Sequence, residues 1–331
     1  RITEAVLRRG DFAYCGLIGS KTKRARFWHR FEQRGVPPAA VARLTCPIGV
    51  PGVAGKEPEV LAVAVVGLRP PTPGWPVDGW AVAMCDVGQG DALVLNAGDG
   101  SGVVVDAGPD PSAVDRCLDR LDIDRVPPLV LTHFHADHVD GLGGVLQDRT
   151  VGAIETTTRL DPADGVRDTV DTALDAGLAP TLAPYAATRT IGDVRLQVLW
   201  PTAAEPVPGP GDGSRANDDS VVLLAEVRGV TVLLTGDVEP PAQARLGAAY
   251  PGLEVDVLKL PHHGSSHQDV DWLRSLSASV VLVSVGADND YGHPSVPVLD
   301  ELAATGAEVA RTDLDGDVLV SGVPGDLSVH H

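Results

Sequence analysis

Four metal-binding side chains lie within six residues of one another, in the run His-Phe-His-Ala-Asp-His. They are His133, His135, Asp137 and His138, and they follow the apolar stretch 128–131. Imidazole nitrogens and carboxylate oxygens suit zinc, manganese or iron. Alternation puts the two first histidines on one side of the turn, while Asp137 and His138 follow at a spacing that can serve a second ion. The motif predicts a two-metal hydrolytic site, in preference to a solvated polar loop.

Two later strands also lead into residues that bind metals. A carboxylate such as that of Asp237, at the end of the apolar strand 230–234, is costly to bury without a cation. We therefore expect Asp237 to bridge two ions, although an aspartate here could instead cap the helix that follows. The strand 255–261 leads into His262 and His263, a pair that suggests one metal ligand and one group facing the substrate.

Two further residues are candidates for contact with the substrate. Lys259 is the only lysine after residue 56, and it either touches a phosphate or stands beside the histidine pair by chance. His293 precedes a proline in the polar loop 286–294, where it is either a site residue or a turn histidine. The clustering of the other candidates favours the site.

The elements that must position these residues alternate between strands and helices. Residues 80–87 and 92–95 predict a hairpin, 102–106 a third strand, and 111–121 a helix that leads back to the metal motif. Downstream, strands are expected at 152–156, 194–200, 221–227 and 280–285, and helices at 141–146, 166–176 and 296–305. The pattern predicts an α/β fold in which polar ligands project from loops at strand ends.

Length and charge indicate two unlike segments. The chain has 331 residues, of which 44% are hydrophobic, enough for two domains with buried cores. Its net charge is −19, yet residues 1–35 hold nine Lys or Arg against three Asp or Glu. The acidic remainder weighs against nonspecific binding of duplex DNA. Residues 67–79 hold four prolines and three glycines, which predicts a linker.

Cysteine spacing and hydropathy bear on the compartment. The four cysteines are scattered without a Cys-Xaa-Xaa-Cys pair, so we expect buried, reduced thiols and no disulfide framework; they are Cys15, Cys46, Cys85 and Cys117. No apolar run is long enough to span a bilayer, and no leader peptide is recognisable. We expect a soluble, cytoplasmic chain as written, and the first residue, Arg1, fits a piece of a longer product.

The first segment, residues 1–66, has a pattern of its own. A short strand from Phe12 runs into a glycine turn and a basic helix at 21–35, an arrangement that either receives an anion or is a tight turn before a solvated helix. The runs YCGLIGSKTKRARF, LTCPIGV and KEPEVLAVAVV resemble the end of the Rossmann-like domain of XdhC-type proteins, accessory factors of molybdenum-cofactor handling. The strands that should complete that fold are missing, so we expect a remnant or fusion artefact without XdhC activity.

Residues 80–331 carry a second resemblance, through DVGQGDA, DAG, THFHADH, NDDS, TGD, LKLPHHGSS and SVGADNDYGHP. This order is similar to the metallo-β-lactamase-fold domain of ComEC-type DNA-uptake proteins. The resemblance implies an αβ/βα four-layer sandwich, with a short α/β appendage before it and the metals at the edge where loops of two sheets meet.

The resemblance also implies roles for the candidate residues. The expected metal ligands are His133, His135, Asp137, His138, Asp237 and His263. The expected catalytic residues are Asp137, His262, His293 and Lys259. Many members of the wider superfamily have a further histidine where this chain offers Asn217, Asp218 and Asp219, so manganese or magnesium is as plausible as zinc for the two divalent ions.

Three functions follow from these expectations. The first is a metal-dependent phosphodiesterase or nuclease on single-stranded DNA, of the type linked to uptake in natural competence. In this family the domain is normally attached to a membrane protein, so a membrane channel domain is a possible partner, and no obligate protein partner is implied. The second is a metallo-hydrolase of a small phosphodiester, lactone or thioester, and the third is a noncatalytic metal-binding module.

Overall fold

The chain divides into two compact units, Arg1–Pro73 and Gly74–His331. The computed structural model describes residues 74–213 and 215–331 and, from the first unit, only 15–16, 31, 34, 36–37, 41 and 44–45. In the first unit β1 (Cys15–Gly16) pairs in parallel with β2 (Leu44–Thr45). The helices and turns expected elsewhere in residues 1–66 lie outside the described residues. The unit boundary falls inside the segment 67–79.

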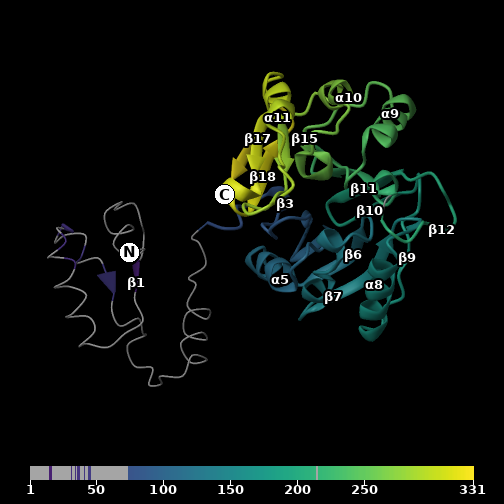
Figure 1. Ribbon diagram of the computed structural model, residues 1–331, viewed down its shortest axis with the longest axis horizontal. Coiled ribbons are helices and arrows are strands. Elements are labelled where there is room, and N and C mark those ends of the chain that lie inside the picture. Colours follow the sequence, from purple (N-terminus) through teal and green to yellow (C-terminus); the bar gives the residue numbers. More distant parts are fainter. Residues whose placement is uncertain are drawn as a thin grey trace. The chain divides into compact units, whose positions relative to one another are not determined.

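The second unit is built on two large sheets (Figure 1). The eight-stranded sheet has the order β19-β18-β3-β4-β5-β6-β7-β9. Its strands are β3 (Trp80–Met84), β4 (Leu93–Gly98), β5 (Ser101–Val105), β6 (Arg125–Leu131), β7 (Thr150–Thr156), β9 (Thr181–Leu182), β18 (Val318–Val323) and β19 (Asp326–His330). The pairs from β18 through β5 are antiparallel, and those from β5 through β9 are parallel.

The seven-stranded sheet has the order β10-β11-β13-β14-β15-β16-β17. Its strands are β10 (Thr188–Ile191), β11 (Val194–Trp200), β13 (Val222–Val227), β14 (Val230–Leu234), β15 (Val257–Lys259), β16 (Val280–Val283) and β17 (Glu308–Arg311). The pairs from β14 to β17 are parallel. A short parallel pair, β8 (Arg159–Leu160) with β12 (Val207–Pro208), lies outside both sheets.

Helices make up the rest of the regular structure. They are α5 (Pro111–Arg120), α6 (Ala136–Val139), α7 (Leu142–Leu146), α8 (Ala163–Asp175), α9 (Pro240–Ala249), α10 (Val270–Ser275), α11 (Val296–Ala303) and α12 (Thr312–Asp315), with the 3₁₀ turns η1 (Asn217–Asp219) and η2 (Pro261–Gly264). Figure 1 shows α9, α10 and α11 along one side of this unit and α5 and α8 along the other. Among the described residues, no helix combines the length and apolarity that crossing a bilayer needs.

Three hydrophobic clusters separate four layers. Strand residues alternate between faces, so Leu93 and Leu95 of β4 join the cluster between the sheets, whereas Val94 joins the cluster under α5. In the other sheet Val232 faces the same inter-sheet cluster, and Leu233 faces the cluster under α9 to α11. Each sheet therefore buries both faces, one against the other sheet and one against helices. The predicted αβ/βα sandwich is confirmed.

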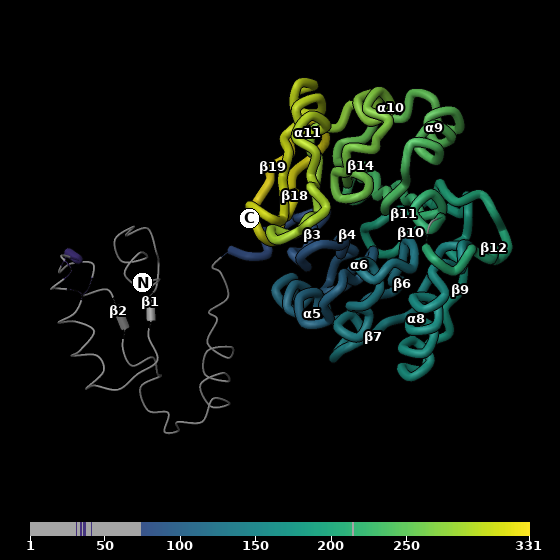
Figure 2. Tube along the Cα trace, viewed as in Figure 1, coloured from purple at the N-terminus to yellow at the C-terminus, as the bar shows by residue number. Residues whose placement is uncertain are grey.

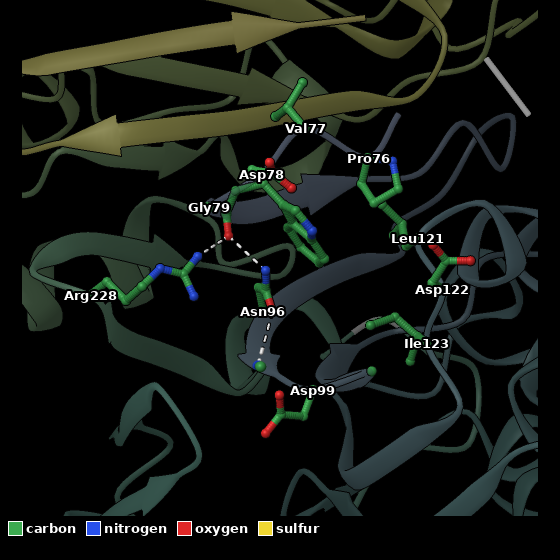
Figure 3. Close-up of a pocket in the computed structure, with 13 residues that line it drawn as sticks. Pro76, Val77, Asp78, Gly79, Asn96, Asp99, Leu121, Asp122, Ile123 and Arg228 are labelled. Atoms are coloured by element: carbon green, nitrogen blue, oxygen red, sulfur yellow. Dashed lines mark hydrogen bonds between the residues drawn. The ribbon is translucent and has the colours of Figure 1, made fainter. Parts of the chain in front are cut away.

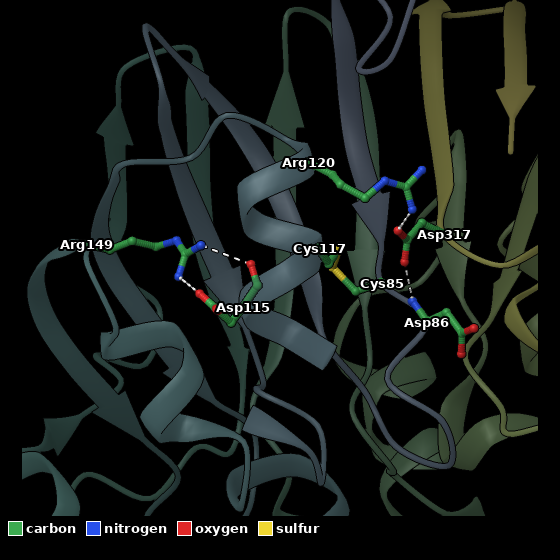
Figure 4. Close-up of a disulfide and its surroundings, with 7 residues drawn as sticks. All are labelled: Cys85, Asp86, Asp115, Cys117, Arg120, Arg149 and Asp317. Atoms are coloured by element: carbon green, nitrogen blue, oxygen red, sulfur yellow. Dashed lines mark hydrogen bonds and ion pairs between the residues drawn. A yellow bond between two sulfur atoms is a disulfide. The ribbon is translucent and has the colours of Figure 1, made fainter. Parts of the chain in front are cut away.

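The prediction of reduced thiols is wrong for two of the four cysteines. Cys85 follows β3 and Cys117 lies on the buried face of α5, and they form a disulfide with a Cα–Cα distance of 5.8 Å (Figure 4). Their sequence separation is 32, and the chain between them folds back through β4 and β5, so spacing along the chain does not reveal this tertiary contact. The bond ties the start of the loop 85–92 to a helix.

The strand ends explain where a site can form. Parallel strands β5 and β6 end at one edge of the first sheet, and β14, β15 and β16 end at one edge of the second. Loops that follow such strands meet outside their carboxyl ends, which is where open α/β sheets bind ligands. Figure 2 shows the short helix α6 near the middle of the unit, between the two groups of helices.

Candidate metal centre

The histidine-rich motif forms the turn from β6 into α6. His133 and His138 are fully buried, and the centroids of their rings lie 4.1 Å apart. His133 Nε2 lies 2.9 Å from His135 Nδ1. Asp137 lies in the first turn of α6, with Oδ1 3.9 Å from His138 Nε2. The turn therefore gathers the four predicted side chains in one place, with two imidazoles inside and the Asp137 carboxylate one-third exposed.

Asp237 joins this group from the second sheet. Its Oδ2 lies 3.3 Å from His138 Nε2 and 3.4 Å from His263 Nε2, and the residue is only 2% exposed. One ligand atom each from His133, His138 and Asp237 lie within 4.8 Å of one another, a spacing suited to one ion. The alternative role as a helix cap does not apply, because the residue at the N-cap of α9 is Glu239.

His263 comes from η2, after β15. Its Nε2 lies 3.2 Å from Asp137 Oδ2, and His263, Asp137 and His138 form a second group of possible ligands. Its Nδ1 lies 2.9 Å from the carbonyl of Ser284, a partner that leaves Nε2 free to face the cluster. His262 and His263 both have a positive φ, 49° and 52°. Such backbone costs about 1–3 kcal/mol for a residue with a side chain, and it persists where surrounding structure holds it.

The electrostatics of the cluster are those of a cation site. Burial alone lowers the pKa of His138, but Asp237 and Asp106 raise it well above its ordinary value. Burial likewise lowers the pKa of His263, yet Asp237 and Asp91 raise it well above that value. The same negative field would attract a divalent ion, since it stabilises positive charge at the imidazole nitrogens.

Asp106 is a site residue for which the sequence suggested no role. It follows β5, accepts hydrogen bonds from the backbone N–H and hydroxyl of Thr132 at 2.7 and 2.8 Å, and lies 2.9 Å from His138 Nδ1. A carboxylate behind a ligating histidine orients the ring and raises its basicity. The usable signal was the same as for Asp237: an aspartate at the end of an apolar strand, here 103–105.

Asp91 is the second residue that was missed, and it corrects the expectation for Lys259. The Lys259 side chain is fully buried, and its ammonium contacts Asp91, lies 3.5 Å from Asp237 Oδ1 and donates to the Gly236 carbonyl at 3.0 Å. The lysine therefore lies beneath the cluster and does not reach its mouth. Asp91 Oδ1 is also 3.3 Å from His263 Nδ1. Its turn, Gly-Gln-Gly-Asp, could have marked it.

Two histidines lie on the open side of the cluster. The His262 side chain is one-quarter exposed, with Nε2 4.0 Å from Asp237 Oδ2 and Nδ1 3.4 Å from Glu239 Oε1. The His293 ring lies 5.4 Å from that of His262, centroid to centroid. The His293 backbone is held by both ends of the Asn289 carboxamide. Both predicted substrate-facing histidines thus border the candidate ligands.

The segment expected to replace a histidine ligand has other partners. Asp219 pairs with Arg159, with 2.6 Å between Oδ2 and Nη2, and Asp218 Oδ1 accepts from the backbone N–H of Glu239. The Asn217 carboxamide donates to Glu239 Oε1 at 3.3 Å. Among residues 74–213 and 215–331, none of these three joins a group of possible metal ligands.

Unpaired polar atoms test whether the cluster fits metal ions. Within the described part of the chain, several buried atoms of the cluster have no hydrogen-bond partner: Oδ1 of Asp237, and Nε2 of His138 and His263. Buried polar atoms are normally hydrogen-bonded, and leaving one unpaired costs about 1–3 kcal/mol. Atoms of the types that bind divalent cations converge here, so the residues fit such ions.

A cavity of about 350 Å³ lies elsewhere (Figure 3). It is bordered by Pro76, Asn96, Ile123 and Arg228, and both Asn96 and Arg228 donate to the Trp80 carbonyl. The metal cluster lies at the start of β4, whereas Asn96 lies near the end of that strand. This cavity therefore takes no part in the metal centre.

Family models match both parts of the chain. The XdhC Rossmann domain matches residues 1–67, and the metallo-beta-lactamase superfamily matches residues 85–285. ComE operon protein 3 of Bacillus subtilis is 26% identical over 72% of this chain and 32% of its own length. Competence protein ComA of Neisseria gonorrhoeae is 28% identical over 71% of this chain and 31% of its own. The predicted resemblances are confirmed, and the chain spans about a third of these relatives.

Solved structures include Igni18, a metallo hydrolase of Ignicoccus hospitalis, at 16% identity and a TM-score of 0.45, covering 76% of this chain and 98% of that one. The superfamily model covers more than half of this chain, including the histidine motif, Asp237 and His263. Because this family model matches more than half of the chain, the chain belongs to the metallo-beta-lactamase superfamily, whose members are metallo-hydrolases.

Proposed function

We propose that residues 80–331 form a metal-dependent phosphodiesterase that degrades single-stranded DNA with two divalent ions. The observation that carries the proposal is the convergence of unpaired ligand atoms on a cluster whose open side is bordered by His262 and His293. The similarity to two competence proteins supports DNA as the substrate class. Zinc, manganese and magnesium all remain candidates for a ligand set of imidazoles and carboxylates.

The residues divide the work of hydrolysis. When bound, divalent ions would neutralise phosphate charge and lower the pKa of a water molecule. The Asp137 carboxylate, one-third exposed, is suited to orient the attacking water by accepting its hydrogen bond. His262 borders the open side of the cluster, with Glu239 Oε1 3.4 Å from its Nδ1 to orient the ring, and is suited to donate a proton to the leaving oxygen. His293 would stabilise charge on the phosphate.

The attachment of this domain to a membrane channel is also a proposal. The chain spans about a third of its competence-protein relatives, so the remainder of such a protein would have to supply transport. The disulfide between Cys85 and Cys117 supports folding in an oxidising compartment, where such bonds persist. DNA that arrives from outside the cell would meet the domain in such a compartment.

A small-molecule phosphodiester is the second candidate substrate. The net charge of −19 favours it, because an acidic body repels a polyanion at long range. The purified chain should therefore be assayed with labelled single-stranded DNA and with a small diester, each with added manganese or zinc. Cleavage of DNA supports the first proposal, and cleavage of the small diester alone supports the second. Tight metal binding without any turnover would indicate a noncatalytic module.

A matched pair of variants ties activity to the cluster. His135→Ala should lower turnover by at least about a hundredfold and reduce the metal content found by elemental analysis, with an unchanged circular dichroism spectrum. His267→Ala, at an exposed histidine outside the metal cluster, is the control and should behave as the wild type. If His135→Ala keeps full activity and metal, the assignment of this centre is wrong.

A further inference from the structure

A series of three aromatic rings runs from the metal cluster to the surface. The rings of His263 and His293 have centroids 6.5 Å apart and planes 28° apart. The rings of His293 and Tyr291 follow at 5.9 Å and 30°. Exposure rises along the series: His263 is 1% exposed, His293 is half-buried and Tyr291 is 75% exposed. The outermost ring, that of Tyr291, is therefore exposed to solvent. It is separated by the His293 ring from His263, a candidate metal ligand.

The loop that carries Tyr291 is anchored to the centre at both ends. The backbone N–H of Gly286 donates to Gln89 Oε1 at 3.2 Å, and that of Ser295 donates to the Gly264 carbonyl at 2.7 Å. Between these anchors the Tyr291 hydroxyl makes no hydrogen bond to any residue that the structure describes. The loop is thus tied to the segments that supply Asp91 and His263, while the ring of Tyr291 lies beside that of His293.

The charge of the site makes such a ring useful. The ligand cluster is rich in carboxylates and the chain carries a net charge of −19. A single-stranded substrate therefore gains little from long-range attraction to its phosphates and needs a contact that does not depend on charge. Base stacking on an aromatic ring is such a contact, and it tolerates any sequence because every base has a flat face.

We propose that Tyr291 is a nucleobase-stacking subsite, which holds a base of the strand beside the phosphate at the metal centre. The proposal rests on the proposed function and adds a binding determinant to it. Tyr291 acts on binding of the substrate and takes no part in proton transfer. The stacking subsite therefore predicts that the protein binds strands that carry bases more tightly than strands that carry only the sugar-phosphate backbone.

The test compares a twelve-residue oligothymidine with an abasic strand of the same length and charge. With manganese or zinc, Tyr291→Ala should raise KM for oligothymidine by about five- to 150-fold, the range for one lost stacking contact, and change kcat less than threefold. Its KM for the abasic strand should match that of the wild type. Tyr291→Phe keeps the ring and should restore the preference, and Tyr185→Ala, at another exposed tyrosine, should leave it intact.

A binding measurement separates this inference from the proposed function. Fluorescence anisotropy with methylphosphonate oligothymidine, which is uncharged and resists hydrolysis, should show weaker binding by Tyr291→Ala than by the wild type, and no such difference with an abasic analogue. Equal effects on both probes, or none, would overturn the stacking role. A wild type that cleaves neither strand but shows this binding difference would overturn the nuclease and keep the subsite.

Discussion

Two buried carboxylates beneath the cluster each have a partner that balances their charge. Asp106 lies against His138 Nδ1 and the N–H and hydroxyl of Thr132. Asp91 contacts the ammonium of Lys259, and neither residue is exposed. Burial raises the pKa of Asp91, but Lys259 and His263 lower it below its usual value, so the pair stays ionised. The Lys259 ammonium thus balances part of the negative charge of the carboxylates in the cluster.

The role of Lys259 can be tested by removing its charge. We expect Lys259→Met to destabilise the fold by about 3–5 kcal/mol, because it removes the ammonium that pairs with the buried Asp91 carboxylate. Adding Asp91→Asn should recover a large part of the loss. Urea unfolding in the presence of a chelator measures both. Arg274→Met, which breaks an exposed ion pair with Glu301, is the control and should cost at most about 1 kcal/mol. Unchanged stability together with a raised KM would instead indicate a lysine that contacts phosphate.

At the scale of elements, the disulfide joins two segments that lead to the cluster. Cys85 precedes the turn that ends in Asp91, and Cys117 lies on α5, which follows the loop after Asp106. Closing a loop with a sequence separation of 32 stabilises a fold by about 3–4 kcal/mol in the chain-entropy model. We expect Cys85→Ser with Cys117→Ser to lower the free energy of unfolding by this order, measured with guanidinium. A reductant should have the same effect on the wild type and none on the variant, and a reductant effect that persists would point to other cysteines.

Asp317 links the same region to β18, and it predicts a dependence on pH. It accepts a hydrogen bond from the Asp86 N–H at 2.7 Å and pairs with Arg120 of α5 (Figure 4). Burial raises the pKa of Asp317, outweighing the effect of the Arg120 cation. The folded state therefore binds this proton more tightly than the unfolded state, and the carboxyl favours folding less as pH rises from about 4 through its folded pKa.

The expected result is a change in relative stability. Asp317→Asn should gain stability relative to the wild type between pH 4 and pH 7, since the amide stays neutral over this range. Thermal or urea unfolding at a series of pH values measures the difference, with Asp300→Asn at an exposed position of α11 as the control. A relative stability that falls over the same range would mean that the ion pair with Arg120 dominates.

Local sequence predicted the elements that carry the site better than the contacts between them. The strands before His133, Asp237 and His262 were expected because each is a buried apolar run with a polar exit. The disulfide and the Lys259–Asp91 pair were not, because their partners are 32 and 168 residues apart and meet only when the sheets assemble. A buried lysine can contact only the groups packed around it. The sequence around Lys259 does not indicate whether its side chain is buried or exposed to solvent.

At the scale of the whole molecule, the hydrophobic clusters and the candidate ligands that the structure describes lie in the second unit. The three hydrophobic clusters of the described chain draw only on residues from Trp75 onward. Among the described residues, each group of possible metal ligands also lies in the second unit, between Asp91 and His263. The segment that matches the XdhC Rossmann domain therefore contributes no described residue to the cores or to the metal centre.

Residues 74–331 should consequently fold and bind metal without the first unit. We expect this shorter chain to unfold cooperatively within about 2 °C of the corresponding transition of the full chain, because it keeps every described side chain of the three hydrophobic clusters. Its metal content and its turnover of any substrate that the full chain accepts should be unchanged. Calorimetry and elemental analysis of the two chains, prepared side by side, measure these quantities. A shorter chain that aggregates or loses metal would mean that the first unit stabilises the second through contacts that the hydrophobic clusters do not include.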